Sequence, residues 1–538
     1  MKSIIKCLGL CSILAFTGCL DLELQNDPNQ VTEENASLDL YFNSIQISYK
    51  NFSHQASDQV MPAVRQRAMT GGNIYESAWT PNGYNFLWRT AYAEMLQDAN
   101  QVIAISDEQG FPYHGGAAKV MKASVLMTLV DMFGDVPYTD AFQGLGNNNP
   151  GPDSGESVYA VALGLLNEAV TDLSTVGAAP ANDLYFGSAD GWLKAANSLL
   201  LRYYINTRLV DASASTSGIN ALVAGGNLIT GTGDDFEFTY GTNRANPDSR
   251  HPYYAAQYET GNGPYMSNFL MWSMYLEQDV VDPRIRYYFY RQDGDVTDED
   301  QFTLDCVAAP FPQHYPVYMP FCTASEDGYW GRDHGDNSGI PPDGFKRTVY
   351  GLYPAGGKFD DDSFASTKNG GVDGAGGAGV TPIMLGSYVD FMLAEAALTL
   401  GTTGDARTLL ESAITKSIAK VTGFGAADAA FAPTQGDIDA YVANAMGRYD
   451  AAADDAGRLE VIMREYWVAS YCSGVEMYNA YRRTGYPSAM QPTREAISGD
   501  FPRVMIYPES FVNLSSNGNQ HNITTQVFWD NNPAGFVN

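Results

Sequence analysis

Hydrophobic residues recur at helical spacing in the first part of the chain. Leu38, Phe42 and Ile45 follow the three-to-four-residue period of one helix face. The same period predicts further helices at Tyr84–Ser106, Ala117–Phe133, Ser157–Leu173 and Asp190–Val210. Ser188 has the side chain and the position of an N-cap for the last of these helices, and Gly134 is typical of a helix end. This part of the chain is therefore predicted to be helical.

The pattern returns towards the end of the chain. It predicts helices at Ser387–Leu400, Asp405–Val421, Gln435–Met446 and Arg458–Arg483. The last one carries an apolar stripe from Leu459 to Tyr481, with Gly485 at the position of a C-terminal cap and Pro487 beyond it. The helices after the one at Leu38–Ile45 form four pairs, two on each side of the region between the helical parts, and paired helices that each expose an apolar face must stack. We expect tetratricopeptide-like hairpins without a fixed repeat period.

The region between the two helical parts, about 212–381, is rich in Gly, Pro, Asn, Asp and Tyr. Its apolar runs are short, so we expect small strands at pieces such as Phe236–Tyr240 and Arg286–Arg291, and a short helix around Ser267–Glu277. Loops of this length usually bind something. The predicted fold is mainly α, one domain over 36–538 with a loop-rich insert that carries small β-strands.

The first residues have the pattern of a secretory signal peptide. Lys2 and Lys6 precede an apolar run over 7–16, which is shorter than the about 20 apolar residues that span a bilayer. Thr17-Gly18-Cys19 resembles the bacterial lipobox, in which the cysteine is acylated. We therefore expect a signal peptide at 1–18 and a lipidated tether at 19–35, since several acyl chains give stable anchoring. The alternative is an ordinary signal peptide and a soluble product.

The segment Leu20–Glu23 (LDLE), followed by Asp27, resembles the acidic signal that sends some bacterial lipoproteins to the cell exterior. Acidic residues also dominate the whole chain, 62 against 31 basic residues, for a net charge of −31. Such a surface repels phosphate backbones, so nucleic acid is not an expected partner.

Three cysteines remain after the signal peptide and Cys19 are set aside. In an oxidising compartment Cys306 and Cys322 could form a disulfide, while Cys472 lies on an apolar helix face. The alternative is three unpaired buried thiols.

Known chemical motifs are absent or incomplete. Gly374–Gly379 spells GxGxxG but has no strand before it and no helix after it, so we interpret it as a flexible loop. Asp293, Asp295 and Asp298 begin like an EF-hand loop, but 298 is not Gly and Leu304 replaces the closing Glu. The histidines lack ligand spacing. We predict no catalytic, metal or cofactor site, although the many acids leave a glycoside hydrolase open.

Aromatic residues with a polar edge outnumber phenylalanine, with Tyr 34 and Trp 7 against Phe 25. Such rings offer a flat apolar face and a hydrogen-bonding edge to a sugar or a peptide. The candidate ligand-binding residues lie in loops or short helices: Trp79, Asn82, Trp272, Tyr329 and Trp330. We expect the last two to be exposed; the alternative for each is core packing. Three tryptophans on helix faces are assigned to the core: Trp88, Trp192 and Trp467.

Four stretches, in their order and spacing, resemble the SusD/RagB family and its SusD-like branch. They are Lys122–Tyr138 (KASVLMTLVDMFGDVPY), Trp192–Arg202 (WLKAANSLLLR), Pro382–Ala397 (PIMLGSYVDFMLAEAA) and Glu476–Pro487 (EMYNAYRRTGYP). The resemblance implies a surface lipoprotein of tetratricopeptide-like helix pairs. It also implies a protein that caps a SusC-like TonB-dependent outer-membrane transporter and captures oligosaccharides or peptides for import.

The expected function is therefore non-catalytic nutrient binding at the outer membrane, on a lipid anchor that faces the cell exterior. Two alternatives remain: a surface glycan hydrolase, and an adhesive or structural surface protein that has no transporter partner.

Overall fold

The computed structural model describes residues 37–296, 306, 309–323, 327–337, 345–351, 356–367 and 373–538. The predicted signal peptide, Cys19 and the tether lie outside the described residues, as do Asp298 and Leu304 of the EF-hand-like segment.

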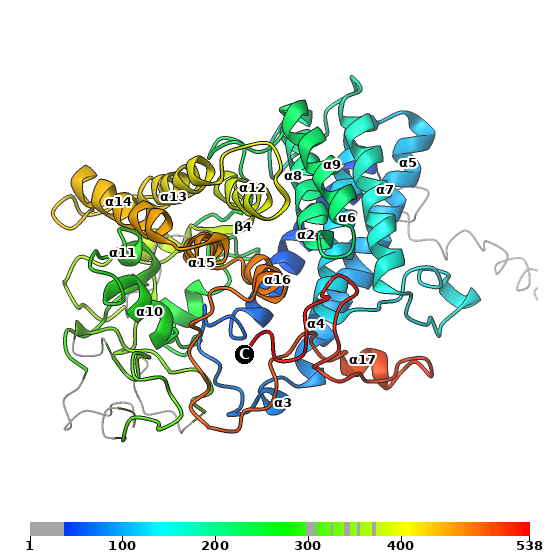
Figure 1. The fold of residues 1–538 in the computed structure, drawn as a ribbon. Coiled ribbons are helices and arrows are strands. Elements are labelled where there is room, and N and C mark those ends of the chain that lie inside the picture. Colours follow the sequence, from blue (N-terminus) through cyan, green and yellow to red (C-terminus); the bar gives the residue numbers. More distant parts are fainter. Residues whose placement is uncertain are drawn as a thin grey trace, which may run out of the picture.

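The first helical part surrounds one buried helix (Figure 1). Its long helices are α2 (Leu38–Val60), α5 (Gln97–Gln109), α6 (Pro112–Phe133), α7 (Gly155–Leu173), α8 (Ala189–Thr207) and α9 (Ala212–Gly225). Shorter elements are α3 (Tyr75–Ala78), η2 (Pro81–Tyr84), α4 (Asn85–Arg89), the π-helix η3 (Thr90–Leu96) and η4 (Gly144–Gly146). Every residue of α6 from Tyr113 to Phe133 is buried, since α2, α5, α7 and α8 all pack against it. A helix that is buried all round needs apolar side chains on every face, as α6 has.

The second helical part has α12 (Gly386–Leu400), α13 (Ala406–Thr422), α14 (Gln435–Ala451), α15 (Asp455–Ala469), α16 (Gly474–Thr484) and the short α17 (Glu509–Val512). Neighbours in sequence pack as pairs, α12 on α13 and α14 on α15. A capping box at Thr434 and Asp437 begins α14. The predicted N-cap Ser188 and C-cap Gly485 are confirmed: Ser188 accepts from the Gly191 amide, and Gly485 has φ 75°.

The single helix predicted over Arg458–Arg483 is wrong. The chain breaks between α15 and α16, where Cys472 adopts φ 66° and the Ser473 amide donates to the Ser470 carbonyl at 2.8 Å. The break lets α16 turn and pack against α2. At the contact, a Cβ added to Gly474 would lie 2.5 Å from the carbonyl oxygen of Ser57. The apolar stripe continues across the break, which is why the pattern conceals it.

Two short antiparallel sheets form in the part of the insert that the structure describes. In one, β1 (Phe236–Thr239) pairs with β4 (Val380–Met384); in the other, β2 (Phe289–Tyr290) pairs with β3 (Val349–Tyr350). Its remaining elements are η5 (Ala255–Glu259), α10 (Asn268–Tyr275), α11 (Ile285–Tyr288) and η8 (Gly374–Gly377). The predicted strand at 236–240 and the predicted helix near Ser267 are confirmed. The predicted start of the loop-rich region at about 212 is wrong, because helix α9 occupies Ala212–Gly225. Arg286–Arg291 divides between α11 and β2.

The glycine motif is a packed turn rather than a flexible loop. The Gly377 carbonyl accepts from the His251 amide at 2.9 Å, and the Gly379 carbonyl accepts from the Tyr240 amide at 2.8 Å. Strand β4 follows directly, so the helix that a dinucleotide site needs does not follow the motif. The mainly α fold of stacked helix pairs with a loop-rich insert is confirmed.

The C-terminal tail, residues 491–538, packs on the first helical part. Buried Asp131 of α6 accepts from Asn479 of α16 at 2.8 Å and from Trp529 Nε1 of the tail at 3.0 Å. It also pairs with Arg202 of α8 at 3.0 Å. One carboxylate therefore joins helices and tail that are far apart in sequence.

Candidate ligand-binding site

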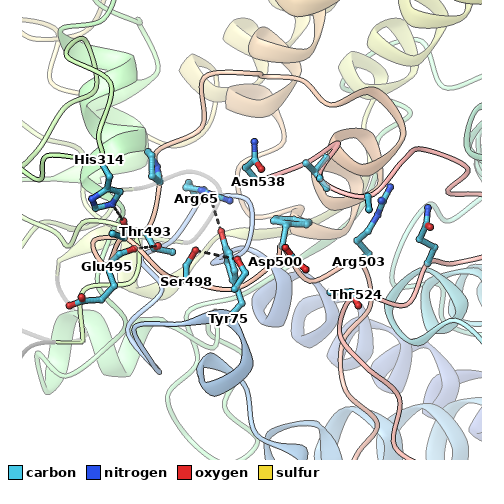
Figure 2. Close-up of a pocket in the computed structure, with 18 residues that line it drawn as sticks. Arg65, Tyr75, His314, Thr493, Glu495, Ser498, Asp500, Arg503, Thr524 and Asn538 are labelled. Atoms are coloured by element: carbon cyan, nitrogen blue, oxygen red, sulfur yellow. Dashed lines mark hydrogen bonds between the residues drawn. The ribbon is translucent and has the colours of Figure 1, made fainter.

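A cavity of about 200 Å³ opens where three distant parts of the chain meet (Figure 2). Arg65 and Tyr75 come from the segment after α2, His314 comes from the insert, and most of the other lining residues belong to the tail. They include Thr493, Glu495, Ser498, Asp500, Phe501, Arg503, Thr524 and Asn538. The site thus forms only when the tail lies across the fold.

Arg65 holds two of these parts together. Its buried guanidinium donates from Nε to the Gln491 carbonyl at 3.0 Å and from Nη2 to the Tyr75 hydroxyl at 3.0 Å. Nη1 donates to the Ala63 carbonyl at 2.6 Å. These bonds offset the left-handed backbone of Arg65, whose φ is 57°. The start of the tail is therefore fastened to the N-terminal segment at the pocket wall.

Tyr75 also contacts a buried histidine, His334. The Tyr75 hydroxyl is 3.0 Å from Nε2 of His334, and both residues are buried. Burial raises the pKa of Tyr75 and lowers the pKa of His334 well below its ordinary value. Both side chains are thus uncharged at neutral pH, which leaves Arg65, Arg503 and the rim carboxylates as the charged side chains that line the pocket.

The pocket combines apolar walls with polar groups at its rim. The rings of Tyr75 and Phe501 meet edge to face at 6.0 Å, while Glu495 and Asp500 are exposed. Aromatic walls and a few hydrogen-bonding groups suit a ligand rich in hydroxyls. Its volume is below the about 300–1,000 Å³ of pockets that enclose a drug-sized ligand. It therefore fits one unit of a chain rather than a whole oligomer.

Of the predicted site residues, Trp79 contacts a lining residue of this pocket, whereas Asn82 is not among the lining residues. Trp79 directly follows α3 and stacks on Tyr75, with ring centroids 6.4 Å apart and planes 6° apart. It is half-buried, and its Nε1 donates to the Gln59 carbonyl at 3.2 Å. Asn82 is exposed in η2 and accepts from Asn85 Nδ2 at 2.8 Å. Trp79 thus supports a pocket residue from behind.

The other three predicted residues lie in the insert, and the expected exposure of two of them is wrong. Tyr329 is 2% exposed and Trp330 is 1% exposed, because Trp330 packs with Val296 and Cys306. Trp272 of α10 is half-buried and stacks on Phe269. A buried ring has no face free for a ligand. The five candidates therefore do not form one site within the described residues.

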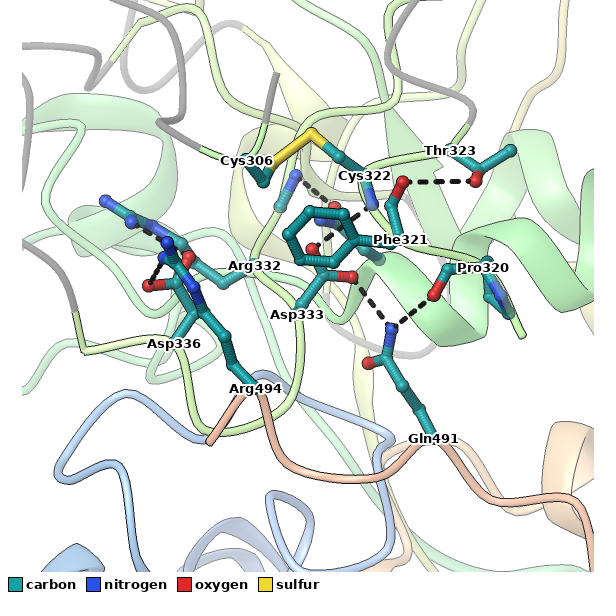
Figure 3. The surroundings of a disulfide bond; sticks show 12 residues. Cys306, Pro320, Phe321, Cys322, Thr323, Arg332, Asp333, Asp336, Gln491 and Arg494 are labelled. Carbon is teal, nitrogen blue, oxygen red and sulfur yellow. Dashed lines mark hydrogen bonds and ion pairs between the residues drawn. A yellow bond between two sulfur atoms is a disulfide. The ribbon is translucent and has the colours of Figure 1, made fainter. Parts of the chain in front are cut away.

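The cysteines are placed as one pair and one buried thiol. Cys306 and Cys322 form a disulfide with Cα atoms 5.7 Å apart (Figure 3), and Cys472 is free and buried. Trp88, Trp192 and Trp467 are in the core, as predicted.

The sequence patterns gave no indication of Arg65, Tyr75, His314 or the lining residues of the tail. Their contacts span up to 426 positions, so local patterns carry no trace of them. The one available signal was the length of the irregular tail from 491, because long loops without regular structure are often functional.

Within the described residues, clusters of His, Cys, Asp and Glu that could hold a metal ion were not found. A search of the same residues found no helix that combines the length and the apolar character of a membrane span.

Stacked helix pairs that support a loop-built pocket define a class of helical ligand-binding proteins. The chain belongs to the SusD-like family, whose model, described as "Starch-binding associating with outer membrane", matches residues 28–304 and 344–508. Members of this family are binding proteins, not enzymes, in agreement with the non-catalytic function expected from the sequence.

Solved structures share the fold. A SusD/RagB family protein from Bacteroides thetaiotaomicron is 18% identical and has a TM-score of 0.69; the alignment covers 93% of this chain and 100% of that one. A SusD homolog from Bacteroides fragilis is 18% identical with a TM-score of 0.67, over 92% and 99% of the two chains. A chitin-binding SusD homolog from Flavobacterium johnsoniae is 19% identical with a TM-score of 0.63, over 92% and 99%. A search of curated proteins found no match.

Proposed function

We propose that this protein is a lipid-anchored outer-membrane receptor that binds an oligosaccharide and passes it to a SusC-like TonB-dependent transporter. The observation that carries the proposal is the family match over most of the chain, together with a pocket built from aromatic walls and exposed hydrogen-bonding groups. The ligand is held by the exposed side chains of Glu495 and Asp500 at the rim, while the buried rings of Tyr75 and Phe501 form the base of the pocket.

The family description and the neighbours support a glycan ligand. The family model is described as starch-binding, and one similar structure is that of a chitin-binding protein. Sugar hydroxyls bind carboxylates and amides, and the apolar faces of sugar rings pack on aromatic walls. A peptide is the other ligand that the resemblance allows, and the binding experiment distinguishes the two.

The binding experiment uses the purified protein without its signal peptide and without Cys19. We expect calorimetric titration to detect an oligosaccharide among starch-derived, chitin-derived and other glycans. Glu495→Ala or Asp500→Ala weakens binding at least about tenfold, since a hydrogen bond to a charged group contributes about 1.5–3 kcal/mol. Asp439→Ala, an exposed acid on α14, is the matched control. Binding of peptides but of no glycan would contradict the oligosaccharide assignment.

Anchoring at the cell exterior is proposed from residues 17–27. In cells grown with labelled fatty acid, the protein becomes labelled and is cut by protease added to intact cells, whereas Cys19→Ala abolishes the label. The transporter co-purifies with the wild-type protein from solubilised outer membranes. An unlabelled protein free in the periplasm would contradict both the anchor and the proposed delivery.

A further inference from the structure

Three strongly exposed apolar side chains lie in the segments that contribute residues to the pocket. Val317 is 97% exposed and Tyr318 is 66% exposed, in the insert; Ile497, in the tail, is 86% exposed. Single exposed apolar residues need no explanation, but a group of them beside a cavity often marks a binding surface. Whether Val317, Tyr318 and Ile497 form such a surface depends on where they lie relative to the pocket.

Val317 and Tyr318 are the two central residues of a tight turn, in which the Met319 amide donates to the Pro316 carbonyl at 2.9 Å. Tyr318 is four residues from His314, which lines the pocket, so its Cα lies within about 14 Å of that wall. Ile497 lies between Ala496 and Ser498, which both line the same pocket. The exposed apolar groups therefore belong to the two segments, one in the insert and one in the tail, that contribute His314, Ala496 and Ser498 to the pocket lining.

The loop that carries the turn is fastened to the pocket wall. His314 Nε2 is 2.9 Å from the Thr493 carbonyl, and the Tyr315 hydroxyl donates to the Pro492 carbonyl at 2.9 Å. At the other end, Gln491 Nε2 donates to the Pro320 carbonyl at 3.0 Å. The turn at 316–319 thus projects from a loop that is held on both sides.

The Cys306–Cys322 disulfide closes the same loop two residues after Pro320 (Figure 3). Asp333 strengthens this end, because its carboxylate accepts from the Cys322 amide at 3.2 Å and from Gln491 Nε2 at 2.8 Å. A covalent closure and buried hydrogen bonds hold the ring of Tyr318 in a limited region of space, which lowers the entropy lost when a ligand contacts it.

We propose that the turn Pro316–Met319, with Ile497 of the tail, is the second half of the ligand site. Resting on the proposed glycan-binding function, the inference is that the pocket holds one sugar unit while Tyr318, with Val317 and Ile497, contacts the units that extend beyond it. The ligand is thus an oligosaccharide chain whose rings present flat apolar faces, and the disulfide is the element that positions this surface.

The test compares a short and a long ligand of the same chemistry. Calorimetry measures the dissociation constants of wild-type protein and Tyr318→Ala for chitobiose and chitohexaose, and for maltose and maltohexaose. For the series that binds, Tyr318→Ala weakens the hexamer about threefold to tenfold, because one aromatic contact is worth about 0.5–1.5 kcal/mol, and leaves the dimer unchanged. Val176→Ala, which removes another fully exposed apolar side chain, is the matched control and changes neither.

Hexamer binding that is unaffected by Tyr318→Ala, or an equal loss for dimer and hexamer, overturns the inference and leaves the proposed function standing. If the wild-type protein binds neither series, the glycan assignment fails for these probes and the inference falls with it.

A second variant tests the disulfide. Cys306→Ser/Cys322→Ser weakens the hexamer as Tyr318→Ala does and retains the affinity for the dimer; circular dichroism verifies that the variant is folded. A folded variant with unchanged hexamer affinity shows that the disulfide does not position the surface. Tyr318 is exposed, so the Tyr318→Ala result stands even where the serine variant does not fold.

Discussion

At the scale of single residues, Asp333 is a carboxylate in an unusual setting. It is fully buried, and burial raises its pKa from 3.8 to about 6 although Gln491 and the Cys322 amide donate hydrogen bonds to it. Asp336 lies nearby and adds like charge. Desolvation therefore outweighs the hydrogen bonds, and the folded protein binds this proton more tightly than the unfolded chain does.

This difference predicts how stability depends on pH. The contribution of protonated Asp333 is complete below about pH 4, where the unfolded chain is also protonated, and is lost as the pH rises through about 6. Two pKa units correspond to on the order of 3 kcal/mol. Urea titration measures the unfolding free energy at pH 4 and at pH 7. Between these pH values the wild-type protein should lose the contribution of Asp333, whereas Asp333→Asn, which has no carboxyl group at this position, should not. Asp439→Asn serves as the exposed control, and a pH profile of Asp333→Asn identical to wild type contradicts the argument.

Residue types were easier to predict from the sequence than residue environments. Trp79 and Trp330 carry the same chemical signal, yet one is half-buried beside the pocket and the other packs in a small core next to the disulfide. Glycine and aspartate around Trp330 suggested an open loop. The burial of Trp330 depends on Val296 and Cys306, which are distant in sequence, and no local pattern reports such contacts. Arg65 was missed for the same reason.

At the scale of elements, periodicity found most of the long helices because each has one apolar face or, for α6, apolar residues on every side. Periodicity did not predict a helix end where the backbone turns without a change in the apolar pattern, or a helix with few apolar residues. The break between α15 and α16 interrupts no apolar stripe, and α9 is rich in Ser and Ala, with only Ser215 and Ile219 buried. The close approach of α16 to α2 requires glycine at position 474, because any side chain there would meet the backbone of α2.

Gly474→Ala is expected to destabilise the protein by about 1–3 kcal/mol, because the added Cβ would meet the carbonyl oxygen of Ser57 at 2.5 Å and force α16 away from α2. Gly447→Ala in α14 is the matched control. Its Cβ meets nothing within 4 Å, so better helix propensity should stabilise the protein by about 0.5–1 kcal/mol. Urea unfolding measures both. Opposite signs are expected, and a neutral Gly474→Ala would show that the helices can separate without cost.

At the scale of the whole molecule, a buried ionic cluster joins the two helical parts. Glu395 of α12 accepts from Arg483 of α16 at 2.8 and 2.7 Å and from Arg208, which follows α8, at 3.0 Å. Arg483 also donates to Asn206 of α8 at 3.0 Å. Arg483, in the last turn of α16, is thus paired across the molecule. Stacked pairs were predictable, whereas the contacts that join the two sets were not.

Breaking this cluster should therefore affect the entire fold. Burial alone would raise the pKa of Glu395, but Arg483 and Arg208 lower it, so the carboxylate is charged at neutral pH. Glu395→Ala leaves two guanidinium groups without their partner, and we expect a loss of about 3–5 kcal/mol. Since the cluster links both helical parts, we expect calorimetry to show one unfolding transition for the wild-type protein and two for Glu395→Ala. Asp450→Ala removes the partner of Arg407 in an exposed ion pair and should leave the midpoint nearly unchanged. Similar midpoints for Glu395→Ala and Asp450→Ala would mean that the two helical parts are held together by apolar packing and not by the ionic cluster.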